Sequence, residues 1–287
     1  MFLSGIADEA GRDLDRQIAA HRELGWSHIE LRMVGAVNAT DLPDADFDRV
    51  AERLAEAGLR VSCFASQIAN WSRPITSDFE RDLAELERAI PRMRRLGTPF
   101  IRCMSYPNAT PPWPEAEWRH VAILRMRALA ARAQEGGITL VHENCSGWGG
   151  LKPESTLDLL DSIRSPALRL VFDTGNPAQY GQDSWRYYEA VRDHIAYVHI
   201  KDYLAPKKPG DEQACFPGEG ICSVRKIVAD LVKSGYDGGF SIEPHIASVI
   251  HLQKDIQDAD LAFRTYVEYG RRLEELLEEV EAKLRAS

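Results

Sequence analysis

The sequence predicts a single α/β domain over residues 1–287, folded as a (β/α)8 barrel of the TIM type. Two observations predict this fold class. Short apolar segments alternate with longer amphipathic segments along the whole chain, and eight such pairs can be counted. The length of 287 residues suits one closed barrel, in which right-handed crossovers make neighbouring strands parallel.

The expected strands are short and mostly apolar. They cover residues 3–10, 27–34, 60–69, 99–106, 138–145, 168–175, 196–203 and 239–246. The expected helices cover residues 13–25, 44–58, 77–97, 114–137, 154–163, 183–195, 224–235 and, long and charged, about 258–285. Leu14, Ile18 and Leu24 share one face of the first helix. Gly58 at the end of the second helix fits a glycine C-cap.

An open, doubly wound sheet is the alternative architecture for such an alternation. It usually carries a glycine-rich phosphate loop, GxGxxG, after its first strand. Residues 4–13, SGIADEAGRD, lack that motif, so the barrel is favoured. Residues 204–222, after the seventh strand, form a long segment without an expected helix or strand. Loops at this end of a barrel often cover the site.

The composition narrows the classes of partner. The formal net charge of −9 disfavours nucleic acid, since an acidic surface repels phosphate backbones. Neither a signal peptide nor an apolar run of about 18 residues is expected, which disfavours a membrane partner. The five cysteines are scattered and form no CxxC motif, so we expect no disulfide framework and a cytoplasmic location.

The candidate site lies at the carboxyl ends of the last four strands, where barrel enzymes keep their catalytic groups. These strands end in HENC, FDTGN, HIKD and IEPH, and each offers one metal ligand: Glu143, Asp173, His199 and Glu243. Burying three carboxylates together costs free energy, and a divalent cation removes that cost. Oxygen donors with one imidazole favour Mn²⁺ or Mg²⁺, with Co²⁺ or Zn²⁺ as alternatives.

Other side chains near these strand ends have two interpretations each. Lys201 and His245 either bind substrate or support the ligands. Arg32, with Glu30 on the second strand, either binds a substrate oxygen or forms an ion pair at the barrel mouth. Trp148 is either a packing residue or an aromatic surface that stacks on a sugar ring.

At these residues the sequence resembles the sugar phosphate isomerase/epimerase family of the xylose-isomerase-like TIM-barrel superfamily. The motifs that carry the resemblance are VHENC, VFDTGNP, YVHIKD, FPGEG and GYDGGFSIEPH. The resemblance implies one metal ion, usually Mn²⁺ or Mg²⁺, bound by Glu143, Asp173, His199 and Glu243. By analogy with ketose 3-epimerases it also implies that Glu143 and Glu243 are the catalytic acid/base pair, working through a metal-stabilised enediolate.

Two departures from those epimerases leave the substrate and the reaction open. The epimerases have a substrate-binding histidine three residues after the aspartate of the sixth strand, where this chain has Asn176. They also have an arginine after the histidine of the seventh strand, near which this chain has Lys201. A related branch of DNA-repair endonucleases needs further histidines, which residues 60–69 and 99–106 lack.

Three functions therefore stand as hypotheses. The first is a metal-dependent isomerase or epimerase of a small ketose or related polyhydroxy carbonyl compound. The second is a metal-dependent dehydratase or lyase, similar to inosose dehydratases, which share the metal site. The third is a non-catalytic barrel that binds a carbohydrate or a partner protein. We expect a small carbohydrate-like substrate as partner, and the resemblance leaves a monomer and a homodimer open.

Overall fold

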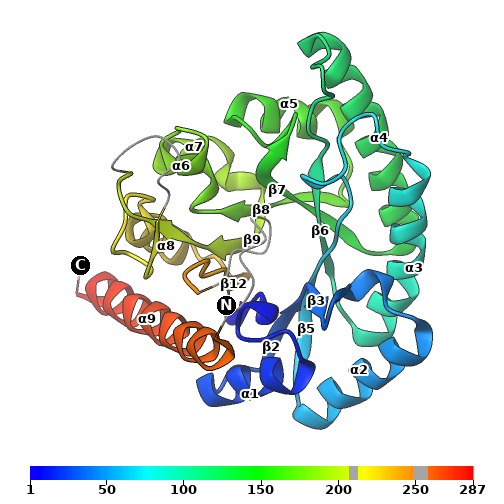
Figure 1. The fold of residues 1–287 in the computed structure, drawn as a ribbon. Coiled ribbons are helices and arrows are strands. Elements are labelled where there is room, and N and C mark those ends of the chain that lie inside the picture. Colours follow the sequence, from blue (N-terminus) through cyan, green and yellow to red (C-terminus); the bar gives the residue numbers. More distant parts are fainter. Residues whose placement is uncertain (207–212, 248–257, 287) are drawn as a thin grey trace.

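The structure, a computed structural model, describes residues 1–206, 213–247 and 258–286. Eight parallel strands form a nearly closed barrel, and helices cover its outer surface (Figure 1). The strands pair in the order β1–β12–β9–β8–β7–β6–β5–β2, and a parallel bridge between Ile6 and Glu30 joins the two ends of the sheet. The predicted barrel is confirmed.

Strands and helices alternate along the chain, and each element overlaps one predicted range. The barrel strands are β1 (Phe2–Gly5), β2 (His28–Leu31), β5 (Arg60–Ala65), β6 (Phe100–Ser105), β7 (Thr139–Gly147), β8 (Leu168–Asp173), β9 (Ile195–Ile200) and β12 (Gly239–Ile242). The helices around them are α1 (Leu14–Leu24), α2 (Asp44–Ala57), α3 (Glu80–Leu96), α4 (Glu115–Gly136), α5 (Pro153–Ile163), α7 (Ser184–Val191), α8 (Val224–Lys233) and α9 (Ala259–Arg285).

Local chemistry sets the helix boundaries. Asp13 caps the start of α1, since its side chain accepts a hydrogen bond from the backbone N–H of Arg16. Gly58 ends α2 with a φ of 71°, a left-handed conformation that glycine adopts without a steric penalty. The predicted C-cap at Gly58 is therefore confirmed.

Two strands were predicted too long. The first strand ends at Gly5, and Ala7–Glu9 form a short 3-10 helix that turns the carboxylates of Asp8 and Glu9 towards Arg32. The predicted seventh strand divides into β9 and the short strand β10 (Asp202–Tyr203), which pairs antiparallel with β11 (Ala214–Cys215). In both places the chain leaves the parallel ladder because polar side chains find their partners beyond its edge.

The segment after β9 folds back on itself. The Asp202 carboxylate accepts hydrogen bonds from the backbone N–H groups of Gly218, Gly220 and Cys222. We expected residues 204–222 to cover the site, but none of the described residues 204–206 and 213–222 lines the cavity reported below. Residues 207–212 of this segment lie outside the described ranges.

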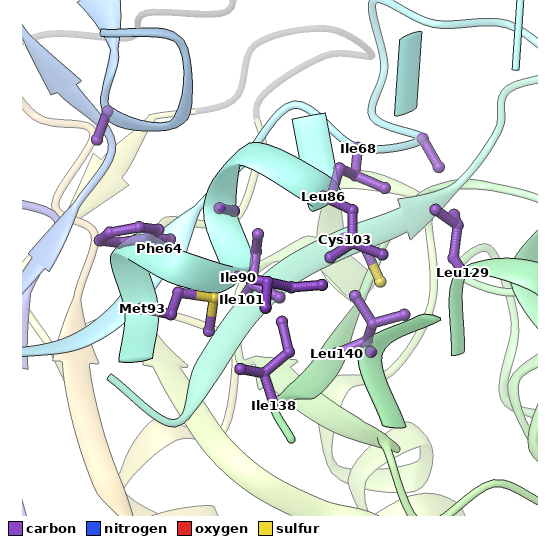
Figure 2. Close-up of a cluster of buried hydrophobic side chains, with 14 of the residues drawn as sticks. Phe64, Ile68, Leu86, Ile90, Met93, Ile101, Cys103, Leu129, Ile138 and Leu140 are labelled. Atoms are coloured by element: carbon purple, nitrogen blue, oxygen red, sulfur yellow. The ribbon is translucent and has the colours of Figure 1, made fainter. Parts of the chain in front are cut away.

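One large apolar cluster lies between the barrel wall and helices α3 and α4 (Figure 2). Its members include Phe64, Ile68, Leu86, Ile90, Met93, Ile101, Cys103, Leu129, Ile138 and Leu140. A second cluster packs α7, α8 and α9 against β8, β9 and β12. These two layers hold the barrel strands, and therefore their carboxyl ends, at fixed positions.

Helix α4 offers a matched test of this packing. Leu129 is fully buried, whereas Leu124 on the same helix is 46% exposed. We expect Leu129→Ala to lower the free energy of unfolding by about 2–5 kcal/mol through lost contacts and a cavity. Leu124→Ala should change it by less than about 0.5 kcal/mol. Urea unfolding followed by circular dichroism measures both, and equal effects would contradict the packing described.

Helix α9 completes the ring of helices beside α1 and α8 (Figure 1). Tyr266, Tyr269 and Leu273 are buried on its inner face. The opposite face is charged, as predicted for the long C-terminal helix. Across the described ranges, no helix combines the length and apolar composition needed to cross a membrane.

Candidate metal centre

Strand alternation builds the inside of the barrel in layers. A small apolar layer comes from four strands: Cys63, Val141, Val171 and Tyr197. Two residues further along β7, β8 and β9, and therefore on the same inward face, lie Glu143, Asp173 and His199. Asp173 and His199 are direct partners in the pairing of β8 with β9. The apolar layer thus forms a floor beneath a polar layer.

Glu243, one residue after β12, completes the polar layer. One ligand atom each from Glu143, Asp173, His199 and Glu243 can be chosen so that all lie within 4.8 Å of one another. All four side chains are buried. The convergence expected from the sequence is therefore present in the structure.

Three carboxylate oxygens in this layer lack a hydrogen-bond donor. Glu143 Oε2, Asp173 Oδ2 and Glu243 Oε2 are buried and accept no hydrogen bond from the described residues. The Lys201 ammonium group lies 3.1 Å from Asp173 Oδ2 and 2.7 Å from Glu243 Oε2 as an ion-pair partner. Facing carboxylate oxygens without donors are costly. The donor set therefore fits a divalent cation that prefers oxygen ligands.

His199 is oriented by carboxylates on both sides of its ring. Its Nδ1 lies 3.4 Å from Glu143 Oε1, and its Nε2 lies 3.1 Å from Glu30 Oε1. Ser241 donates a hydrogen bond of 2.6 Å to Glu30. Burial opposes protonation, but Glu30 and Glu143 raise the pKa of His199 to about 10. A carboxylate behind an imidazole is the arrangement that orients histidine ligands in metal sites.

Glu143 is ionised by its neighbours. Arg102 Nη1 lies 3.4 Å from Glu143 Oε2, and Asn176 Nδ2 donates a hydrogen bond of 3.2 Å to Oε1. Burial favours the neutral carboxyl group, but Arg102 and then His199 outweigh it and lower the pKa of Glu143 to about 2. Glu143 can therefore act as a ligand or as a base.

Glu243 sits among three cationic side chains. Arg32 Nη1 donates a hydrogen bond of 2.9 Å to Glu243 Oε1, and His245 Nε2 lies 3.1 Å from the same oxygen. Despite the opposing effect of burial, Lys201 and His245 hold the pKa of Glu243 well below its usual range. Glu243 is the second ionised carboxylate at the cavity.

Asp173 behaves differently from the two glutamates. Its Oδ1 accepts hydrogen bonds of 2.8 Å from the backbone N–H groups of Gly175 and Asn176, at the start of the short helix α6 (Asn176–Gln179). Burial raises the pKa of Asp173 to about 6 even though Lys201 opposes the change. With Oδ1 engaged, Oδ2 is the oxygen left for a cation.

A cavity of about 240 Å³ opens above these groups. Four of the predicted substrate-binding residues line it: Arg32, Asn176, Lys201 and His245. Glu143 and Glu243 line it as well. Arg32 also forms the predicted ion pair, but with Asp8, Glu9 and Glu243 rather than with Glu30.

Trp148 lies elsewhere. Its side chain is 5% exposed within the apolar cluster of Figure 2, and the Arg119 guanidinium group lies 5.6 Å from its ring centre. It is not among the described residues that line the cavity. The prediction that Trp148 binds substrate is corrected, because apolar contacts of the loop after β7 draw the indole into the core.

The family model described as xylose isomerase-like TIM barrel matches residues 18–269. The chain belongs to this family. The matched range contains all four candidate ligands, and the superfamily resemblance noted from the strand-end motifs is confirmed.

Curated relatives of this xylose isomerase-like barrel are named as enzymes. An inosose dehydratase of Lacticaseibacillus casei is 28% identical over 149 residues, which covers 46% of this chain and 49% of the relative. The chain thus spans about half the length of the inosose dehydratase it matches. The 2-epi-5-epi-valiolone 7-phosphate 2-epimerase of Actinoplanes sp. is 28% identical over 219 residues, covering 76% of this chain and 73% of the relative.

Solved structures share the barrel. A D-tagatose 3-epimerase-like protein superposes with a TM-score of 0.75 at 19% identity, over 99% of this chain and 100% of that protein. A xylose isomerase-like TIM barrel protein from Mycobacterium smegmatis, in complex with magnesium, has a TM-score of 0.69 at 19% identity, over 96% and 97% of the two chains. At these identities the similarity shows the fold.

The analysis of strand ends missed two polar residues of this xylose isomerase-like barrel. Glu30 supports His199, and Arg102 on β6 lines the cavity beside Glu143. Both are lone charged residues in otherwise apolar strands, HIEL and FIRCMS. A charged residue on the inward side of a buried strand is the signal that points to them.

Proposed function

We propose that this protein is a divalent-metal-dependent enzyme that moves a proton at a carbon next to the carbonyl group of a small ketose or related polyhydroxy compound, as isomerases and epimerases do. The observation that carries the proposal is the pair of ionised carboxylates, Glu143 and Glu243, that line one cavity beside Asp173 and His199. A non-catalytic binding barrel needs no such acid/base pair.

The expected cofactor is one Mn²⁺ ion, with Mg²⁺, Co²⁺ or Zn²⁺ as alternatives. Glu143, Asp173, His199 and Glu243 would hold it, because they offer oxygen and imidazole donors and three oxygens without a hydrogen bond. When bound, a divalent cation supplies electrophilic stabilisation of negative charge that develops on a substrate oxygen.

The side chains assign themselves to the remaining steps. Glu143 and Glu243 come from β7 and from the end of β12, so they approach a bound substrate from different sides. One carboxylate removes the proton from carbon, and the other returns a proton to the opposite face in an epimerisation. Arg32 holds Glu243 through Oε1 at 2.9 Å. Asn176 and Lys201, 3.3 Å apart, are placed to bind substrate hydroxyl groups.

A dehydratase is the second candidate, favoured by the similarity to inosose dehydratase. The same proton removal starts the reaction. The hydroxyl group on the next carbon then leaves as water, after the second carboxyl group has protonated it. The product is lighter than the substrate by one water molecule, whereas an isomerase or epimerase conserves mass.

Deuterium exchange separates these candidates. Mn²⁺-loaded protein is incubated in D₂O with a panel of ketoses and keto-polyols, and the products are analysed by NMR and mass spectrometry. Deuterium at the carbon beside the carbonyl group with conserved composition supports isomerase or epimerase activity. Loss of water supports the dehydratase. Metal binding without exchange from any compound would favour the non-catalytic carbohydrate-binding barrel.

Glu30 gives a test of the metal centre itself. We expect Glu30→Gln to weaken binding of Mn²⁺ by roughly tenfold to a hundredfold, because the carboxylate that orients His199 loses its charge. Competition with a fluorescent chelator measures the affinity. Glu115→Gln, on the exposed surface of α4, is the control and should leave the affinity unchanged. Equal affinities in both variants would remove Glu30 from this role.

The proposal extends to partners and location. We propose that the protein acts in the cytoplasm on a small carbohydrate-like substrate, without nucleic acid or membrane, as a monomer or a homodimer. The net charge of −9 supports the absence of a nucleic-acid partner. Light scattering of the purified protein measures the oligomeric state.

A further inference from the structure

The cations that line the cavity differ in how far their charge is already matched. Arg32 contacts Asp8 at 3.1 Å, Glu243 at 2.9 Å and Glu9 at 3.2 Å. Lys201 likewise contacts two carboxylates, as described above. In these two side chains the positive charge is compensated within the protein, so neither has a charge to spare for a ligand.

Arg102 is the exception. Its side chain is buried, with 6% of the residue exposed, and it lines the cavity. Nη2 donates a hydrogen bond of 3.2 Å to the backbone oxygen of Ser66, but Nε is buried without an acceptor among the described residues. Its ion-pair partner there is Glu143, with Nη1 3.4 Å from Oε2. A guanidinium group with unused N–H donors is suited to bind an anion.

The proposed cofactor sharpens this contrast. Glu143 is also a candidate ligand, and a cation held by it would compensate its charge. Arg102 would then keep a buried positive charge without a carboxylate of its own, which is unfavourable unless a ligand supplies one. The position of Arg102 on β6, next to β7, puts that anionic group beside the reacting carbons rather than at the cavity rim.

We propose that the substrate carries a carboxylate close to its carbonyl group, that is, a polyhydroxy keto acid, and that Arg102 binds this carboxylate. This inference rests on the proposed function and names its substrate class. One spare cation matches the single charge of a carboxylate. The neighbouring lining residues on the β5 side, Ser66, Gln67 and Asn70, are neutral, whereas a dianionic phosphate calls for several donors or charges.

Three ligands with one carbon skeleton test the proposal. D-fructose is uncharged, 2-keto-D-gluconate has a carboxylate in place of its first hydroxymethyl group, and D-fructose 1-phosphate has a phosphate there. Calorimetry with Mn²⁺-loaded protein measures their affinities for the wild type and Arg102→Gln. The control is Arg49→Gln, since Arg49 is 69% exposed on α2.

We expect the wild type to bind the keto acid at least about tenfold more tightly than D-fructose. Arg102→Gln should lose most of this preference while its affinity for D-fructose stays within about threefold, and Arg49→Gln should keep the preference. Arg102→Lys, which keeps the charge but not the planar donors, should lie between wild type and Arg102→Gln. It carries the test if Arg102→Gln does not fold.

Four outcomes overturn the proposal: no binding of the keto acid, no preference in the wild type, a preference that survives in Arg102→Gln, or tighter binding of the phosphate. Equal weakening of all ligands by Arg102→Gln would show that Arg102 only positions Glu143, and overturns it too. Mn²⁺ titration of the same samples keeps the two proposals apart. Failure to bind Mn²⁺ refutes the proposed function, whereas one bound ion without a carboxylate preference refutes only the substrate class.

Discussion

The double variant Glu143→Gln/Glu243→Gln should fold as the wild type does and yet lose both its bound divalent cation and its proton-transfer activity. Two of the four candidate ligands lose their charge, while their size and most hydrogen-bonding capacity are kept. Without an acid/base pair and an electrophile, we expect the rate of deuterium exchange to fall by at least about 10⁴-fold.

Metal content per chain is the direct measurement for this variant. Wild-type protein purified without chelator should contain about one Mn²⁺, Mg²⁺, Co²⁺ or Zn²⁺ ion per chain. The control is Glu115→Gln/Glu135→Gln, a pair of exposed glutamates on α4, which should keep the ion. A wild type that binds no metal even after incubation with Mn²⁺ would refute the mechanism and favour a non-catalytic binding barrel.

Replacing Arg32 with methionine should destabilise the barrel by about 3–5 kcal/mol, because three buried carboxylates lose their shared counter-ion. The loss should depend on pH. Burial raises the pKa of Glu9 to about 8 although Arg32 opposes it, so the variant raises this pKa further. A carboxyl group with a raised folded-state pKa destabilises the fold more as pH rises, so the loss should be larger above pH 8 than at about pH 6.

Urea unfolding with chelator present, at both pH values, measures this effect. The control is Arg49→Met on the surface of α2, where the ion pair with Asp46 is solvent-exposed and should contribute less than about 1 kcal/mol. A loss for Arg32→Met that is as small as for Arg49→Met, or one that grows as pH falls, would contradict the ion-pair network described.

Much of the candidate site could be predicted because alternation along a strand is a local property. Once Glu143 is assigned to the inner face of β7, its position relative to Val141 follows from the strand itself, and the same holds for Asp173 and His199. Parallel pairing then places strand ends at one rim of the barrel. The positions of these ligands required no long-range information beyond the barrel.

The supporting residues could not be predicted in the same way. Arg32 was expected beside Glu30, its neighbour on the chain, but it pairs with Asp8, Glu9 and Glu243, while Glu30 faces His199 from across the barrel. These partners are set by which side chains share the barrel interior. No spacing along one segment records that.

The sequence by itself determined the barrel, the order of its elements and the four strand-end side chains that converge, because hydrophobic periodicity and parallel topology follow from local patterns. Only the tertiary structure decided how charge is distributed around them. It matched Arg32 and Lys201 with carboxylates, left Arg102 with unused donors and drew Trp148 into the core. Charge compensation and burial depend on distances between residues far apart in the chain, and these distances exist only in the folded protein.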